Sequence, residues 1–363
     1  MKNNKFLRIL LRTVISVLLV ILIVALSYIA YLFIDYERIE DNISLEVVDK
    51  TGSLVPVNKD LKALSYNIGF CAYTQDFSFF MDGGESSWAK SEESVGEVLA
   101  DIGEFVNSQD ADITLMQEVD ENSTRSYHVN QKQYLIDSVA TCDAVSATNF
   151  DSSFLFYPFL EPHGKSLSGI LTFSKYNIES ATRRSLPVED SIMKFFDLDR
   201  CYAVSRLKCE NDKELVLYNA HLSAYTSDGT IATEQLKLLL NDMKAEYDKG
   251  NYVICGGDFN KDLLQNSGKI FGVSGEDYTW AQAFPLDMLN NTGFSLIAPF
   301  DKNNPVASCR NTDEPYKEEG QFNVTLDGFI VSDNVTVSKS DVIDLEFKYS
   351  DHNPVFMNFR LEG

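Results

Sequence analysis

A run of 22 residues without a charged side chain occupies positions 13–34, close to the N-terminus. About 20 consecutive apolar residues allow a helix to cross a bilayer core roughly 30 Å thick. We therefore predict a transmembrane anchor at 13–34, which removes this segment from the packed core of any globular domain. Basic residues precede the run and acidic residues follow it. By the positive-inside rule, residues 1–12 lie in the cytoplasm and the remainder of the chain lies outside.

A cleaved signal peptide is the alternative interpretation of this segment. Ala25 and Ser27 place small residues at the spacing of a cleavage site. The apolar run continues to Ile34, however, which is beyond a usual cleavage site. A retained anchor is therefore favoured. It predicts a single-pass protein of the cell membrane with an extracytoplasmic domain.

The chain after the apolar run is strongly acidic. All 54 aspartate and glutamate residues follow position 34, together with 27 of the 31 lysine and arginine residues, which leaves a formal net charge of −27. This charge repels phosphate backbones and disfavours nucleic acid as a partner, although metal ions at a nuclease site would neutralise it locally. Six cysteines without a CxxC pair resemble neither a disulfide framework nor a cysteine metal site. No obligate protein partner is indicated.

Residues 61–363 are predicted to form one domain, preceded at 35–60 by a stalk or a leading strand. Residues 91–107 carry apolar side chains at helical spacing and begin with Ser91, a suitable N-cap, so a helix is predicted there. A second helix is predicted at 231–247. Short apolar runs predict strands at 61–70, 112–119, 169–174, 201–208, 214–220, 252–256, 322–331 and 354–360, with 201–208 and 214–220 close enough to form a hairpin. Strands inside and helices outside indicate an α+β sandwich.

Polar side chains stand at or just past the ends of these apolar runs. Taken singly, each has a structural explanation, because asparagine and aspartate are common in turns and a glycine pair such as Gly256-Gly257 can mark a tight turn. Taken together, side chains at the ends of sheet strands are expected to gather in one cleft. The residues are Asn67, Glu118, His221, Asp258, Asn260, Asp327, Asp351 and His352.

The motifs around these residues resemble those of the endonuclease/exonuclease/phosphatase superfamily, which includes deoxyribonuclease-like enzymes and neutral sphingomyelinases. They are LSYNIG at 64–69, QEVD at 117–120, NAHL at 219–222, GGDFN at 256–260, LDGFIVSD at 326–333 and SDHNPV at 350–355. The resemblance runs from about residue 61 to 362. It implies a four-layer α/β sandwich, in which two packed and mainly antiparallel β-sheets carry a divalent-metal site at one edge.

The resemblance also implies the metal ligands. Glu118 is expected to be the principal ligand, with Asn67 and Asp351 as further ligands or as groups that support them. Hydrolysis of a phosphate ester requires neutralised phosphate charge and an activated water. Oxygen ligands without cysteine suit Mg²⁺, and Mn²⁺ or Ca²⁺ could replace it.

The resemblance assigns catalytic roles to five further side chains. His352 is expected to act as general base or to contact the phosphate, with Asp327 fixing its tautomer. His221 is expected to stabilise the pentacovalent transition state. Asp258 is expected to position the attacking water or assist the leaving group, and Asn260 to donate to a phosphate oxygen. The division of the general-base role between Asp258 and His352 stays open.

Three more residues are candidates for substrate contact. Arg125 follows the QEVD motif and could pair with a phosphate, or could be a surface arginine. His163 precedes the strand at 169–174, where solvation of a loop is the favoured explanation. Arg310 lies between the GGDFN and LDGF motifs, where family members carry loops that face substrate.

The sequence therefore favours a membrane-anchored, metal-dependent phosphoesterase. The acidic domain beside a membrane favours a phospholipid headgroup or a small phosphorylated molecule as substrate. An extracytoplasmic endo- or exonuclease is the first alternative. An inactive surface-binding module is the second, although retention of the whole set of polar motifs speaks against it.

Overall fold

The computed structural model describes residues 2–139, 141–190, 192–195, 199–224, 230–275, 278 and 280–363. The chain divides into two compact units, Met1–Arg38 and Ile39–Gly363. The first unit contains α1 (Lys2–Asp35), which is long and apolar enough over Lys5–Asp35 to cross a membrane. This is the helix predicted at 13–34, extended at its basic end.

The second unit is built on two seven-stranded sheets. The first sheet has the order β1 (Ile43–Leu45), β7 (Ile178–Ser185), β8 (Cys201–Lys208), β9 (Glu214–His221), β10 (Tyr252–Asp258), β14 (Asp327–Ser332) and β11 (Phe294–Ile297). The second has the order β15 (Val335–Val342), β16 (Val355–Leu361), β3 (Leu61–Asn67), β4 (Ile113–Asp120), β6 (Leu167–Ser174), β5 (Asp143–Asp151) and β2 (Val47–Val48). Each sheet is antiparallel except for one parallel pair, β9 with β10 and β3 with β4. A short ribbon joins β12 (Cys309–Arg310) and β13 (Asn323–Val324).

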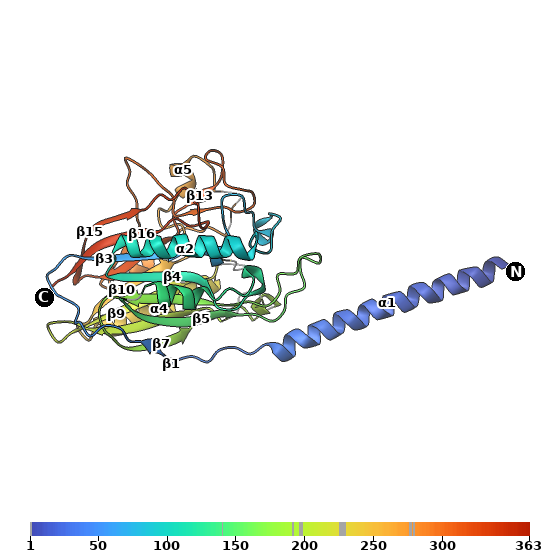
Figure 1. Ribbon diagram of the computed structural model, residues 1–363, viewed down its shortest axis with the longest axis horizontal. Helices are drawn as coiled ribbons and strands as arrows, with labels where there is room; N and C mark the ends of the chain where they lie inside the picture. Colours follow the sequence, from blue (N-terminus) through green and yellow to red (C-terminus); the bar gives the residue numbers. More distant parts are fainter. Residues whose placement is uncertain are drawn as a thin grey trace. The chain divides into compact units, whose positions relative to one another are not determined.

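Helices cover the outer faces of both sheets, as the layers in Figure 1 show. Apolar side chains of α2 (Glu92–Gln109) and α3 (Gln131–Ser138) pack on the outer face of the sheet that contains β3 and β4. Those of α4 (Thr230–Tyr247) pack on the outer face of the sheet that contains β9 and β10. The remaining helices are α5 (Ser267–Phe271) and the 3₁₀ turns η1 (Gly69–Cys71), η2 (Phe80–Asp82), η3 (Thr124–Ser126), η4 (Ile192–Phe195) and η5 (Leu286–Leu289).

The strands of the inner layers alternate between two cores. In β10, Tyr252 and Ile254 face the core between the sheets, whereas Val253 and Cys255 face the core under α4. Successive side chains of a strand point to opposite faces, so a strand covered on both sides is apolar throughout. This explains the continuous apolar run YVIC and confirms the four-layer α+β sandwich.

Several element predictions are confirmed and one is wrong. Ser91 caps α2, because its hydroxyl accepts a hydrogen bond from the Ser94 amide at 3.1 Å, and β8 and β9 form the expected hairpin. The single strand predicted at 322–331 is two strands, β13 and β14. Ser308 Oγ accepts hydrogen bonds from the amides of Leu326 and Asp327 at 2.9 and 3.1 Å. These bonds separate the pairing of β13 with β12 from the pairing of β14 with β10.

Polar or short strands outside the long apolar runs were not predicted individually: β5, β7, β11, β12 and β15 were missed, and β1 and β2 fall in the segment 35–60 that was predicted as a stalk or a leading strand. These last two strands join different sheets.

A buried amide ties the two sheets together beneath the site. Asn219 of β9 accepts a hydrogen bond from Gln117 Nε2 at 2.9 Å and donates to the carbonyl of Leu171 at 3.1 Å. Gln117 and Leu171 belong to the opposite sheet. A buried amide is stable only when its polar atoms are paired, so this contact sets how the sheets face each other.

Candidate active site

The polar residues at the strand ends meet at one edge of the sandwich. Parallel pairing brings the carboxyl ends of β9 and β10 together, and Asp258 lies in register with His221 on one side. The antiparallel partner β14 places Asp327 in register with Asp258 on the other side. The pairing of β3 with β4 ends at Asn67 and Gln117, beside Glu118. Register alone therefore places these side chains in neighbouring positions.

Glu118 reaches the site through a distortion of its strand. The pairing of β4 with β6 shifts register between Met116 and Val119, and Glu118 has a positive φ of 54°. This left-handed backbone is unfavourable for glutamate, and bulges of this kind re-aim side chains next to active sites. The carboxylate consequently turns towards Asn67, whose Nδ2 lies 3.2 Å from Glu118 Oε1.

Asn67 lies at the centre of the contacts. Its Nδ2 also lies 3.0 Å from Asp258 Oδ2 and 3.5 Å from His352 Nε2. Its Oδ1 accepts the Gly69 amide at 3.0 Å, and its carbonyl accepts the Ser350 hydroxyl at 2.9 Å. One buried amide therefore connects the end of β3 with β4, with β10 and with the segment before β16.

His352 is held by Asp327. His352 Nδ1 lies 2.7 Å from Asp327 Oδ2, which also accepts the Ser308 hydroxyl at 2.7 Å. Burial alone would lower the pKa of His352, but Asp327 together with other nearby groups, among them Asp351, outweighs it and raises that pKa well above its ordinary value. The expected orientation of His352 by Asp327 is present in the geometry. Ser308, which the sequence did not single out, fixes Asp327 in turn.

Asp258 stands between two imidazoles. Its Oδ2 lies 3.6 Å from His221 Nε2 and 3.7 Å from His352 Nε2, and its Oδ1 accepts the Asn260 amide at 2.8 Å. Burial raises the pKa of Asp258 to about 6. Burial also lowers the pKa of His221 well below its ordinary value, and the nearby positive charge of Arg200 adds to this. The two histidines thus differ, with His221 favoured as neutral and His352 as protonated.

The oxygen donors fit a hard divalent cation. Glu118 and Asp351 are partly buried in the same pocket, and withdrawal from solvent raises the pKa of each carboxyl. The charge of Asp351 raises the pKa of Glu118 further. A cation between such groups would relieve this cost, and carboxylate and amide oxygens are the ligands that Mg²⁺ takes. Glu118 and Asp351 are the residues that would hold it. Asn67 would support Glu118, because its Nδ2 faces that carboxylate and its Oδ1 accepts the Gly69 amide.

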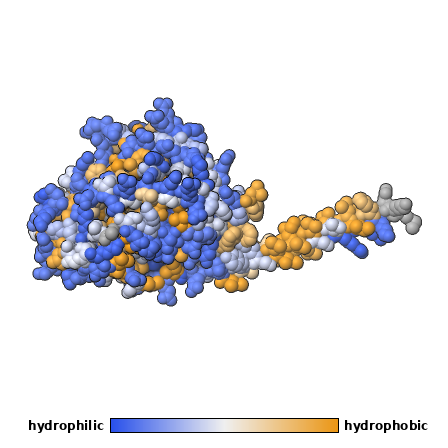
Figure 2. Space-filling view, viewed as in Figure 1, coloured by the Kyte–Doolittle hydropathy of each residue, from blue (hydrophilic) through white to orange (hydrophobic). Residues whose placement is uncertain are grey.

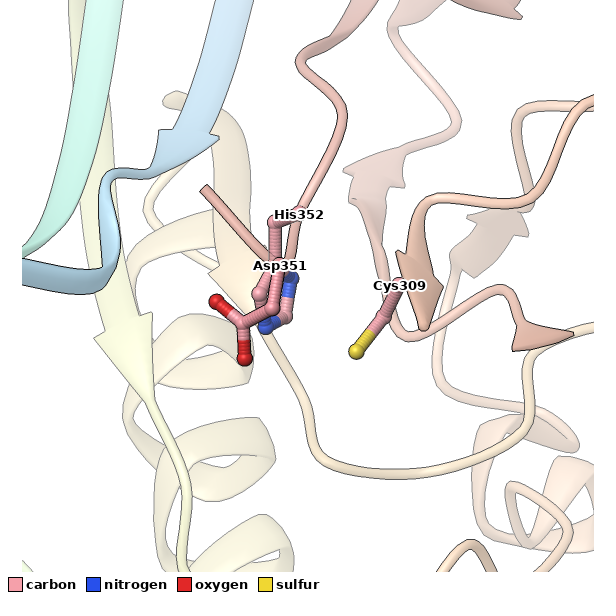
Figure 3. Close-up of side chains that lie close together, drawn as sticks. All are labelled: Cys309, Asp351 and His352. Atoms are coloured by element: carbon pink, nitrogen blue, oxygen red, sulfur yellow. The ribbon is translucent and has the colours of Figure 1, made fainter. Parts of the chain in front are cut away.

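Cys309 lies close to these groups without matching their chemistry. Its Sγ and ligand atoms of Asp351 and His352 lie within 4.8 Å of one another. Figure 3 shows that the carboxylate of Asp351 points away from Cys309. Burial raises the pKa of the Cys309 thiol to about 12. A protonated thiol is a poor metal ligand, so the oxygen set is the better candidate.

Arg125 lines the pocket but is committed to an internal ion pair. Its guanidinium makes two hydrogen bonds to Asp120, at 2.9 and 3.1 Å, and lies 3.7 Å from the ring centre of Phe70. The alternative of a surface arginine is wrong, because the side chain is buried. Asn260 also lines the pocket, and its Nδ2 donates to the Leu222 carbonyl at 2.7 Å.

His163 and Arg310 are likewise buried at the pocket. The favoured explanation of His163 as a solvated loop residue is wrong, because its Nδ1 lies 3.3 Å from the Ser87 carbonyl and burial lowers its pKa to about 4. The guanidinium of Arg310 donates to backbone carbonyls, among them those of Thr74 and Phe77 at 3.2 and 3.4 Å. This indicates that Arg310 holds the pocket wall.

Sequence reasoning missed other residues that line the pocket. Arg200 lies just before β8, and Asn149 and Phe150 lie near the end of β5. Neither segment carries a recognisable motif, and β5 was not predicted as a strand. Only the packing of the two sheets brings these side chains to the mouth of the site.

Comparison with known proteins agrees with this geometry. The sequence profile described as "Endonuclease/Exonuclease/phosphatase family" matches residues 64–352. The chain therefore belongs to the endonuclease/exonuclease/phosphatase family, whose members are metal-dependent hydrolases of phosphate esters. A search of curated proteins found no match.

Solved structures show the same fold at low sequence identity. An endonuclease/exonuclease/phosphatase from Beutenbergia cavernae is 15% identical, with a TM-score of 0.58 over 84% of this chain and 72% of that one. ANGEL2, a 2′,3′-cyclic phosphatase, is 17% identical, with a TM-score of 0.54 over 90% and 100%. TDP2 from D. rerio, solved with a single-stranded DNA product, is 13% identical, with a TM-score of 0.51 over 84% and 100%.

Proposed function

We propose that this chain is a membrane-anchored phosphodiesterase that hydrolyses a phospholipid headgroup or a small phosphorylated molecule outside the membrane with the help of Mg²⁺. One observation carries the proposal. Hydrogen bonds and contacts below 4 Å connect Asn67, Glu118, Asp258 and His352 into one cluster at the pocket, beside His221. Such a cluster offers oxygen ligands, a carboxylate that can accept a proton and two imidazoles whose pKa values are shifted in opposite directions.

Each side chain has a role in this proposal. Asp258, with its pKa near 6, is ionised at neutral pH and can orient or deprotonate the attacking water. His352, kept cationic by Asp327, donates a hydrogen bond to the phosphate. Neutral His221 and Asn260 stabilise charge that develops on the phosphoryl oxygens. Mg²⁺ supplies Lewis-acid polarisation when it is bound by Glu118 and its neighbours.

A nuclease is the second candidate. The net charge of −27 after residue 34 disfavours a long polyanion. The family includes nucleases, so a nuclease stays a candidate. In either enzyme, Mn²⁺ or Ca²⁺ could take the place of Mg²⁺. An inactive binding module is the third candidate. It has no physical need for a buried His352–Asp327 pair or for a strained Glu118.

Metal removal and Glu118→Gln test the proposal with the full-length chain in detergent. Hydrolysis of bis-p-nitrophenyl phosphate, sphingomyelin, inositol phosphates and plasmid DNA is measured with Mg²⁺ and after chelation. We expect chelation to abolish hydrolysis and Mg²⁺ to restore it. Glu118→Gln, which removes the ligand charge, is expected to raise the Mg²⁺ concentration for half-maximal rate about tenfold or more.

Glu121→Gln is the matched control, because Glu121 pairs with Lys132 at 2.5 Å and lies just beyond β4. Its Mg²⁺ response is expected to equal that of the unsubstituted chain. Activity that survives chelation, or equal effects of the two substitutions, would refute metal-dependent catalysis at Glu118. The preferred substrate of the panel separates the phosphodiesterase from the nuclease.

We further propose that residues 13–34 span the membrane, that residues 1–12 are cytoplasmic, and that the catalytic domain at 61–363 is extracytoplasmic. Lys5–Asp35 supplies the length and apolarity that a spanning helix requires. Protease added to intact cells is expected to remove the domain and to leave an N-terminal fragment inside. Full protection until the cells are permeabilised would reverse this orientation.

A further inference from the structure

The segment between β5 and β6 exposes large apolar side chains. Among the large apolar residues that the structure describes in Ile39–Gly363, the four most exposed are Phe156, Tyr157, Phe159 and Leu160, at 51, 61, 82 and 101%. We call residues 152–164 the apolar hairpin. It projects from the sandwich as the green loop in Figure 1, and apolar surface is gathered at its tip in Figure 2. Contiguous exposed apolar side chains mark a surface that meets a partner or a membrane.

The apolar hairpin is held firmly at its base. Leu155 and Gly164 exchange two backbone hydrogen bonds of 3.0 Å. The Trp88 indole donates to the Pro162 carbonyl at 2.7 Å, and the Ser87 hydroxyl donates to the Glu161 carbonyl at 2.6 Å. The tip is therefore presented to solvent by a fixed frame, so its exposure costs free energy that an apolar environment would recover.

The base of the apolar hairpin forms part of the pocket. His163 lines the pocket together with Met81, which is itself 41% exposed. The ring of Phe80 lies 5.8 Å from that of Tyr157 and 5.6 Å from that of His163. Whatever covers the tip will therefore lie next to the mouth of the active site.

Ile39, at the start of the domain, is connected to the base of the apolar hairpin through Asp199. The Ile39 amide donates to Asp199 Oδ1 at 2.9 Å, and the Asp151 amide donates to Asp199 Oδ2 at 3.3 Å. Asp151 is the last residue before the apolar hairpin. One buried carboxylate thus joins the hairpin to the point where the chain enters the domain.

The chain that leads to this point is short. Helix α1 ends at Asp35, and four residues later Ile39 is already bonded to the domain. Four extended residues span at most about 14 Å. If α1 spans a bilayer, the base of the apolar hairpin cannot lie far from that surface.

The charge of the apolar hairpin indicates which kind of lipid surface it would bind. Residues 152–164 contain no lysine or arginine, and the following Lys165 lies 3.9 Å from Asp151. Binding to anionic lipids usually depends on clustered basic residues. The hairpin lacks them, and the net charge of the domain is strongly negative. A zwitterionic surface fits this chemistry.

We propose that the apolar hairpin inserts into the zwitterionic bilayer that α1 spans and holds the mouth of the pocket at the lipid headgroups. The proposal rests on the membrane anchoring under the proposed function. It narrows the substrate to a phosphate ester presented by the bilayer. Each large apolar side chain that enters the bilayer favours docking by about tenfold or more.

Insertion is tested with a fluorescent label on the full-length chain in phosphatidylcholine vesicles. The six native cysteines are buried, so a cysteine placed by Leu160→Cys can be labelled selectively with nitrobenzoxadiazole. Quenching by phosphatidylcholine that carries a nitroxide on its acyl chain is expected. Leu54→Cys is the matched control, because Leu54 is also exposed, at 48%. The next residue, Val55, donates its amide to the carbonyl of Lys208, which lies at the end of β8 that is far from the apolar hairpin. This label is expected to stay unquenched.

Function is tested with Phe159→Ser/Leu160→Ser in phosphatidylcholine vesicles that also contain sphingomyelin. We expect hydrolysis of vesicle-borne sphingomyelin to fall about tenfold or more, while hydrolysis of soluble bis-p-nitrophenyl phosphate is unchanged. Three results would overturn the proposal. They are equal quenching at positions 54 and 160, quenching only in anionic phosphatidylglycerol vesicles, and burial of the tip between two copies of the chain. Absence of soluble diester hydrolysis in the unsubstituted chain would refute the proposed function instead, and the quenching result would still decide the insertion.

Discussion

His352→Ala is expected to lower kcat for phosphodiester hydrolysis by about 10²- to 10⁴-fold, the range associated with loss of a positioned acid or base. The ring nitrogen Nε2 lies 3.7 Å from Asp258 Oδ2 and 3.5 Å from Asn67 Nδ2, where a phosphate would meet it. Truncation removes that group and leaves Asp327 with a buried charge. The kcat of purified full-length variant and parent, measured at saturating Mg²⁺, checks this prediction.

Two further variants separate chemistry from folding. Asp327→Asn keeps a side chain of the same size but removes the charge that holds His352 cationic, so a smaller loss of kcat is expected with little change in KM. His128→Ala removes an exposed histidine that bonds Asn122 at 2.6 Å, outside the site, and should leave kcat unchanged. If His352→Ala retains parental kcat, or if its loss of activity merely follows a loss of folded protein in circular dichroism, His352 has no catalytic role.

Gly257→Ala is expected to destabilise the domain by at least about 4 kcal/mol, which is exceptional for one methyl group. Gly257 has a φ of 146°, and a Cβ there would lie 1.9 Å from the Ala220 carbonyl oxygen. That oxygen belongs to the backbone of β9 and cannot move without separating β9 from β10. The interpretation of Gly256-Gly257 as a tight turn is wrong, because both lie inside β10.

Thermal unfolding of full-length variants measures this effect, with a fall in Tm of about 10 °C or more expected. Gly96→Ala is the matched control. Gly96 lies on the exposed side of α2, and a methyl group there would meet nothing within 4 Å beyond the backbone of its own helix. Alanine at this position should stabilise by up to about 1 kcal/mol, because glycine is the poorer helix former. A Gly257→Ala chain that melts like its parent would show that β9 and β10 are not so closely packed.

Much of the fold followed from periodicity. The inner strands β3, β4, β9 and β10 are largely buried on both faces and have mainly apolar sequences, which the sequence shows directly. Strand β7, which is next to the short edge strand β1, and the edge strand β15 carry polar side chains on exposed faces, so their pattern resembles that of a loop. The break between β13 and β14 depends on hydrogen bonds that the Ser308 hydroxyl accepts from backbone amides 18 and 19 residues later in the chain.

Much of the candidate site followed from motifs at strand ends, because a strand that ends in a polar residue delivers it to a sheet edge. His163 and Arg310 show the limit of this reasoning. Their burial depends on segments that meet only in the folded domain, near Ser87 and Thr74 respectively. Arg200 was missed because nothing local distinguishes it from a surface arginine.

The order of polar motifs along the chain was sufficient to indicate the family, the layered fold and the chemistry of oxygen ligands and imidazoles. These are properties of residue type and spacing, which a linear chain displays. Tertiary structure alone decided that the pKa of His221 is lowered and that of His352 is raised, because burial and neighbours from other segments set each pKa. It also placed the apolar hairpin beside the pocket and the start of the domain, because Asp199 joins segments that are more than a hundred residues apart in sequence.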